Sequence, residues 1–201
     1  MKRLSLFLIS LLMVVSTQAQ KVVENDSLYA DTRYGELLLN RGQLIKFVDS
    51  NSTSLRFGIM EPEIYTQNRS VYINEQKSGY FFKLSLKVSN VTFQTFIWYQ
   101  DVDEIIKAIH RLKDSVEKDC ESMPEYINNY YKTKDGFEIG YIVKKKGKKA
   151  KSNWYMSWKY YAQEIDIDID MMLLTFQTAQ KQIGEMIQRD RASYELIKFS
   201  D

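Results

Sequence analysis

The chain of 201 residues carries 28 lysines and arginines, 26 aspartates and glutamates, one cysteine and one histidine. One cysteine excludes an internal disulfide, and a single cysteine with a single histidine excludes a His-rich metal site or a multi-cysteine cluster. The hydrophobic content of 44% and the aromatic content of 13% are typical of a folded chain and argue against a disordered one. No glycine-rich phosphate loop, Gly-x-Ser-x-Gly or His-Glu-x-x-His motif indicates an enzyme class.

Residues 1–19 have the pattern of a cleavable secretory signal. A basic start precedes an apolar run that ends at Val15, and Thr17 and Ala19 occupy the −3 and −1 positions for cleavage before Gln20. About a dozen apolar residues are too few to span a bilayer, which needs roughly 20. We expect cleavage near Ala19/Gln20 and a periplasmic or secreted protein whose mature part has no transmembrane segment. The alternative is an uncleaved anchor or a buried N-terminal helix.

Loss of this segment makes the remaining chain neutral. Residues 1–19 contain two basic and no acidic residues, which leaves 26 of each sign. A neutral body has no long-range field with which to hold a polyanion. The charge therefore argues against nucleic acid as a partner.

The residues that follow the signal predict a leader and then a β-rich unit. Residues 20–33 are polar and have no periodicity, which predicts a mobile leader. The first unit, residues 34–120, is predicted to begin with a series of strands. These lie at 36–47 (around an Asn40-Arg41-Gly42 turn), 55–60, 71–73, 80–88 and 91–99, the last two joined at Ser89-Asn90.

A helix is predicted to end the first unit. Asp101 and Glu104 have the spacing of a capping box in which aspartate takes the capping position. Apolar residues then recur at helical spacing to about Lys118, with charged residues on the other side. His110 lies beside the apolar stripe and Cys120 follows it. We interpret both as non-catalytic, because nothing in the sequence places them together.

The second unit, residues 121–201, begins at Met123-Pro124 and is predicted to repeat this plan. Its Asp135-Gly136 pair accepts the positive φ angles of a tight turn and predicts a hairpin. Thr175 is predicted to cap a final helix. The predicted strands are 126–132, 137–145, 154–161 and 164–171, the last of which alternates apolar and acidic residues.

A shift of 74 residues places the later strands, the cap and the helix of the second unit on those of the first. We therefore predict an α+β fold of two repeated antiparallel strand-strand-strand-helix units, with helices covering the sheets. The alternative is two unrelated α+β segments.

Two segments carry a resemblance to known proteins. They are Asn40-Arg41-Gly42-Gln43-Leu44-Ile45-Lys46-Phe47 and Tyr99-Gln100-Asp101-Val102-Asp103-Glu104-Ile105-Ile106. Both resemble a group of exported Bacteroidota proteins of unknown function, over about residues 35–190, and the resemblance implies neither an activity nor site residues. The repeated sheet-plus-helix plan is also similar in architecture to TATA-binding-like and whirly-type proteins, a likeness from which no function follows.

Asp166, Asp168 and Asp170 form the sharpest polar pattern. On a strand they would lie on one face at intervals of about 6.6 Å, and like charges in such a ladder repel one another. A hard cation such as Ca²⁺ would offset this repulsion, and a metal site there would suit a metal-assisted hydrolase. Pairing with lysines such as Lys159, or simple solvation, is the interpretation that we favour.

A basic hairpin precedes Trp154-Tyr155. Its lysines next to aromatic residues could bind a polyanion, such as lipid headgroups, a surface glycan or extracellular nucleic acid. We favour a solvated turn instead, because the mature chain is neutral. The lysines concerned are Lys144, Lys145, Lys146, Lys148, Lys149 and Lys151.

Aromatic residues exceed what one buried sheet face needs. Within 91–99, Phe96 and Trp98 alternate with Phe93 and Ile97. Either both faces of the sheets are covered or one presents an aromatic surface, for which Trp98 and Trp158 are the candidate contacts. The leading hypothesis is an exported, non-enzymatic module without a cofactor that binds a protein or glycan through one sheet face. A hydrolase that uses the aspartates, or a polyanion-binding lysine hairpin, is the alternative.

Overall fold

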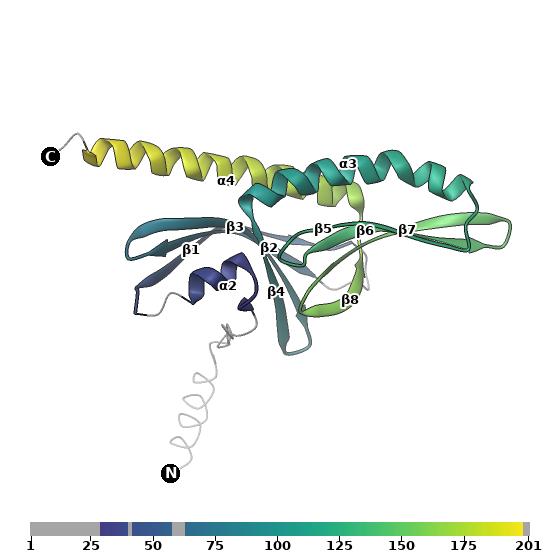
Figure 1. Ribbon diagram of the computed structural model, residues 1–201, viewed down its shortest axis with the longest axis horizontal. Helices are drawn as coiled ribbons and strands as arrows, with labels where there is room; N and C mark the ends of the chain where they lie inside the picture. The colour runs from purple at the N-terminus through teal and green to yellow at the C-terminus, as the bar shows by residue number, and fades with distance from the viewer. Residues whose placement is uncertain (1–28, 40–41, 58–62, 199–201) are drawn as a thin grey trace, which may run out of the picture.

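The computed structural model describes residues 29–39, 42–57 and 63–198 (Figure 1). The predicted signal peptide and leader residues 20–28 lie outside this part, as do positions 40–41 of the predicted turn and 58–60 of one predicted strand. The elements are α2 (Arg33–Leu38), β1 (Ile45–Leu55), β2 (Ile64–Ile73), β3 (Gln76–Val88), β4 (Val91–Trp98), α3 (Tyr99–Glu121), β5 (Tyr126–Lys132), β6 (Glu138–Lys146), β7 (Lys149–Trp158), β8 (Tyr161–Asp166) and α4 (Ile169–Lys198).

The strands form two antiparallel sheets, which confirms the predicted α+β class. Sheet A has the order β1-β2-β3-β4 and sheet B the order β5-β6-β7-β8, so strands that pair in a sheet are also consecutive in the chain. A long helix follows each sheet. The repeated unit thus contains four strands and a helix, one strand more than the unit predicted from the sequence. Within the described residues, neither helix has the length and apolar content needed to cross a bilayer.

The register between the two units differs from the prediction. β2 and β6 begin 74 residues apart, as the predicted shift requires, but β4 and β8 begin 70 residues apart, and so do α3 and α4. No single shift therefore relates the two units, and the predicted one fails at the starts of the last strand and of the helix. That shift equated Asp101 with Thr175 as helix caps, and neither is one. Asp101 lies in the first turn of α3, and Thr175 lies inside α4, where its hydroxyl donates to the Met171 carbonyl.

Each long helix packs on the sheet of the other unit. Figure 1 shows α3 running over sheet B and α4 running back over sheet A, with the two helices side by side where they start. In α3, Leu112 packs with the buried Tyr141 and Val143 of β6. The apolar faces predicted for the two helices are therefore confirmed as buried, but each is covered by the opposite repeat.

Phe176 of α4 lies where the two repeats meet. It is fully buried, and its ring centroid lies 5.5 Å from that of Phe82 in sheet A and 5.7 Å from that of Phe137 beside sheet B. It belongs to a single hydrophobic cluster that contains residues of both sheets, among them Leu84 of β3 and Met156 of β7. One core thus holds both sheets, and neither unit can bury its apolar surface alone.

The face of sheet A opposite α4 is covered by the start of the described chain. Tyr34 of α2 stacks on Phe96 with centroids 3.6 Å apart, and Tyr29 packs edge-on against both rings. A Cβ at Gly35 would lie 1.7 Å from the Tyr29 carbonyl oxygen, so only glycine fits there. Residues 29–33, assigned to the leader in the sequence analysis, are thus packed into the fold.

The first predicted strand is partly a helix. Residues 33–38 form α2 because the Thr32 hydroxyl accepts a hydrogen bond from the Gly35 N–H at 3.0 Å, which satisfies a free donor of the first turn. The strand itself begins only at Ile45. The prediction failed here because the cap lay inside the residues assigned to the leader.

A buried arginine lies beneath α2. The Arg69 guanidinium is bidentate to Asp49, with N–O distances of 2.6 and 2.9 Å, and it lies 4.9 Å from the Phe47 centroid. Burial raises the pKa of the Asp49 carboxyl, but hydrogen bonds and charge from Arg69, helped by Lys83, outweigh burial and lower this pKa below its usual 3.8. The ionised carboxylate is therefore the form that the fold stabilises.

We expect Phe176→Ala to lower the free energy of unfolding by about 3–5 kcal/mol, because the cavity removes contacts to both sheets. Chemical denaturation with hydrogen exchange read separately in the two sheets would show both losing protection in one transition. Gln177→Ala, an exposed neighbour on α4, is the control. Two separate transitions, one for each sheet, would contradict a shared core.

We expect Asp49→Asn to cost about 1–3 kcal/mol at neutral pH, because Arg69 loses charged hydrogen-bond acceptors. Since the folded-state pKa of Asp49 is lowered, its contribution is present above pH 3.8 and is lost as the pH falls through the lower folded value. The stability difference between wild type and variant should therefore shrink on acidification. Denaturation curves across this range, with the exposed Asp114→Asn as control, measure it; a pH-independent difference would refute the assignment.

Candidate functional site

The β5–β6 hairpin presents two tyrosines on the outer face of sheet B, the face away from α3. Along β5 the exposure alternates: Ile127 packs toward α3, while Tyr126 and Tyr130 are 55% and 49% exposed. Four residues of strand separate the two rings by about 13 Å. We name the surface formed by Tyr126, Asn128 and Tyr130 the tyrosine face. β5 is also one of the two edge strands of its sheet.

A polar network forms the floor of the tyrosine face. The hydroxyl of Tyr155, a residue only 1% exposed, lies 2.8 Å from Glu138 Oε1 and 2.9 Å from Asn128 Oδ1. Burial, followed by the Glu138 carboxylate, raises the pKa of Tyr155. Its hydroxyl therefore stays protonated at neutral pH and holds these two polar side chains in fixed positions on the face.

The rim of the tyrosine face carries both signs of charge. Lys144 Nζ lies 5.7 Å from the Tyr126 ring centroid, and Lys132 Nζ lies 3.5 Å from Glu138. Such mixed charges give no strong local field of one sign. The face therefore offers aromatic surface and hydrogen-bonding groups rather than a charge.

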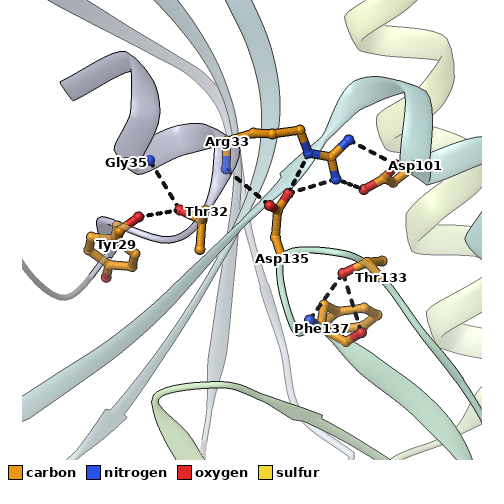
Figure 2. Close-up of polar contacts among 8 residues, drawn as sticks. All are labelled: Tyr29, Thr32, Arg33, Gly35, Asp101, Thr133, Asp135 and Phe137. Atoms are coloured by element: carbon orange, nitrogen blue, oxygen red, sulfur yellow. Dashed lines mark hydrogen bonds and ion pairs between the residues drawn. The ribbon is translucent and has the colours of Figure 1, made fainter. Parts of the chain in front are cut away.

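The turn of this hairpin is held from the first repeat by Arg33 (Figure 2). Asp135, buried in the turn, accepts hydrogen bonds from the Arg33 backbone N–H at 3.0 Å and from Arg33 Nε at 2.9 Å. The same guanidinium also pairs with Asp101 in the first turn of α3. Thr133 closes the turn by accepting from the Phe137 N–H at 3.1 Å. One arginine thus joins α2, α3 and the hairpin that carries the face.

The hairpin is held from the other side by the end of α3. The Tyr141 hydroxyl donates to Asp119 Oδ2 at 2.6 Å and accepts from Asn129 Nδ2 at 2.9 Å. Burial, with the hydrogen bond to Asp119, raises the pKa of Tyr141 to about 12. Because β5 is fixed by both contacts, its exposed side chains are presented on a rigid strand.

The two tryptophans expected to contact a ligand lie elsewhere. Trp158 is 3% exposed in the main core, and Trp98 is half-buried against Phe81, with ring centroids 4.9 Å apart. Neither ring lies on an open sheet face, because Trp158 is part of the main core and Trp98 packs against the cluster that α2 covers on sheet A. Tyr126 and Tyr130 were not among the predicted contacts, although the Tyr-x-Asn-x-Tyr alternation of the predicted strand 126–132 places both rings on one face.

The three aspartates do not form the predicted ladder. β8 ends at Asp166, which accepts from Asn153 Nδ2 at 2.6 Å; Asp168 accepts from the backbone N–H groups of residues 170 and 171 and so caps α4. Asp170 lies in the first helical turn and pairs with Lys113. The strand prediction for 164–171 is wrong here because acidic residues suit a helix start as well as an exposed strand face. Within the described residues, no group of three or more His, Cys, Asp or Glu side chains is placed to hold a metal ion.

The lysine hairpin is confirmed as the β6–β7 turn. Gly147 has a φ of +66°, and the lysines from 144 to 149 are all exposed. Lys145 pairs with Glu125 at 3.1 Å. Polyanion binding at this tip stays a prediction. His110 is exposed on α3.

We expect Asp135→Ala to destabilise the protein by about 3 kcal/mol, because Arg33 keeps only one carboxylate partner. Hydrogen exchange should increase in α2 and in β5 together, since both depend on this side chain. Lys134→Ala, an exposed change in the same turn, is the control and should leave exchange unchanged. Faster exchange confined to β5 would show that the contact between Arg33 and Asp135 does not hold α2 in place.

The comparisons with known proteins identify no relative. No family model matches the chain, no curated protein matches it, and no solved structure matches it.

Proposed function

We propose that this protein is an exported, non-enzymatic binding module that holds a neutral glycan on the tyrosine face. One observation carries the proposal: two half-exposed tyrosine rings stand on the outer face of a rigid edge strand, above the polar floor formed by Asn128, Glu138 and Tyr155. The corresponding face of sheet A is covered by α2 and its aromatic cluster. Export follows from the N-terminal pattern of residues 1–19.

The chemistry of the face suits sugars. Tyrosine rings are apolar on their faces and carry a polar hydroxyl, so they pack on C–H surfaces while remaining hydrated at one end. Amide and carboxylate groups beside them offer hydrogen bonds to hydroxyls in fixed directions. Because the rings are about 13 Å apart, a chain of several sugar units is needed to reach both.

The charge pattern favours a neutral glycan over an acidic one. On this face Lys132 lies beside Glu138 and Lys144 lies beside Tyr126, and the chain without residues 1–19 has equal numbers of acidic and basic residues. A polyanion would instead meet the exposed lysines at the β6–β7 tip. The tyrosine face lies on β5 and the lysine tip lies at the β6–β7 turn, so variants of one site leave the other intact and a measurement can tell them apart.

We expect the double change Tyr126→Ala and Tyr130→Ala to weaken glycan binding about tenfold or more, since each ring loses a stacking contact worth about 1 kcal/mol. Affinity electrophoresis in gels with soluble neutral α-glucan, β-glucan, mannan or xylan measures this. Both rings are about half exposed, so the melting temperature should not fall. Tyr65→Ala removes a tyrosine that is 42% exposed on β2 of sheet A and is the matched control.

Two outcomes would overturn this proposal. If none of the four glycans retards the wild type, the face does not bind neutral glycans. If binding is found but falls steeply between about 50 and about 500 mM salt, contacts between charged groups dominate and the ligand is not held as a neutral glycan. Loss of that binding in Lys148→Gln with Lys149→Gln, two exposed lysines at the tip, with the tyrosine variant unaffected, would transfer the function to the lysine hairpin.

A further inference from the structure

A groove lies between α4 and the face of sheet A that α4 covers. The tyrosine face, in contrast, lies on sheet B, on the face that no long helix covers. Its volume is about 200 Å³. Close packing normally leaves only small voids in a protein interior. The groove exists because small side chains meet here: Thr53 and Thr66 on the sheet face Thr175, Thr178 and Ala179 on the helix.

A buried amide faces this groove. Asn68, on β2 beside Phe82 of β3, is 1% exposed and lines the groove. Its Nδ2 donates to Gln182 Oε1 at 2.8 Å, but its Oδ1 is buried and has no hydrogen-bond partner among the described residues. A buried acceptor without a partner costs about 1–3 kcal/mol. A hydrogen-bond donor within the groove would remove that cost.

The groove carries no charged lining residue. Its walls combine Leu55, Phe82 and Ala179 with threonine, asparagine and glutamine side chains. Met171 and Leu174, which are 39% and 64% exposed, lie at its mouth. An ionised ligand would be desolvated there without an opposite charge, which is unfavourable. A neutral molecule with an apolar body meets no such penalty.

From this geometry we propose that the groove is a second binding site, for a small neutral molecule with an apolar body and one hydroxyl or N–H donor aimed at Asn68 Oδ1. The volume sets the size. At about 200 Å³ the site is smaller than the roughly 300–1,000 Å³ of sites for drug-sized ligands, so the ligand is a single-ring or short-chain molecule. The site is independent of glycan binding, because the tyrosine face belongs to sheet B.

Cyclohexanol and cyclohexanone are the probes, because they match in size and only the alcohol can donate. We expect the alcohol to bind the protein at least about tenfold more tightly than the ketone, as a missing donor leaves Asn68 Oδ1 unpaired. Titrations followed by the methyl signals of Met171, Leu174 and Leu55 in NMR spectra give both affinities. No methyl shift with either probe, or equal affinities for the two, would overturn the proposal.

Variants of two residues locate the binding. Thr175→Leu fills the groove and should abolish both titrations, whereas Thr175→Val keeps the side-chain volume and should retain them. Asn68→Ala should remove the preference for the alcohol while retaining weak binding of both probes. Unchanged titrations in Thr175→Leu would place the probes elsewhere and overturn the site, whether or not Asn68→Ala folds.

Discussion

The rest of the structure depends on one constraint: the apolar face of each long helix is buried by the sheet of the opposite repeat. Phe176 shows the consequence, because its ring lies between Phe82 of sheet A and Phe137 of the hairpin turn that begins sheet B. A single core therefore runs through both repeats. The free energy gained from hydrophobic burial is roughly proportional to the apolar area removed from water. One repeat alone would leave the apolar faces of its helix and its sheet exposed and would lose this stabilisation.

Because each long helix covers only one face of the opposite sheet, each sheet has a second face that no long helix covers. The two repeats differ in what lies on that second face. In sheet A it is covered by α2, which stacks Tyr34 on Phe96 above the buried Arg69. In sheet B the equivalent face carries Tyr126 and Tyr130 at about half exposure. Arg33 connects these two treatments, because it starts α2 and also fixes the turn of the hairpin that carries the tyrosines. The covered face contributes stability, and the open one is free to bind.

Both proposed sites are departures from the packing rules that the rest of the chain obeys. Large aromatic rings are left half exposed on one sheet, and small threonines stand where a core would have larger side chains on the other. Asn68 adds a buried oxygen without a partner among the described residues. Departures of this kind are expected at functional positions, because a fully packed and fully paired surface offers nothing to a ligand.

Local patterns were sufficient for much of the fold. Alternation and turn chemistry predicted the strands 80–88 and 126–132 and the Asp135-Gly136 hairpin, because these signals lie within a few residues of one another. The α+β class and the repeat were also predicted from the order of such elements. Local signals failed at the start of α4, where Asp168 ends a strand-like pattern by capping a helix.

Only the tertiary structure decided which surfaces became sites. Period-2 alternation places Tyr126 and Tyr130 on one face of a strand, but it does not say whether a helix covers that face. The exchange of α3 and α4, the docking of α2 on sheet A alone and the poor fit of α4 over Thr53 and Thr66 are contacts between distant parts of the chain. Such contacts depend on shape and on the sum of many small packing energies, so no short stretch of sequence specifies them.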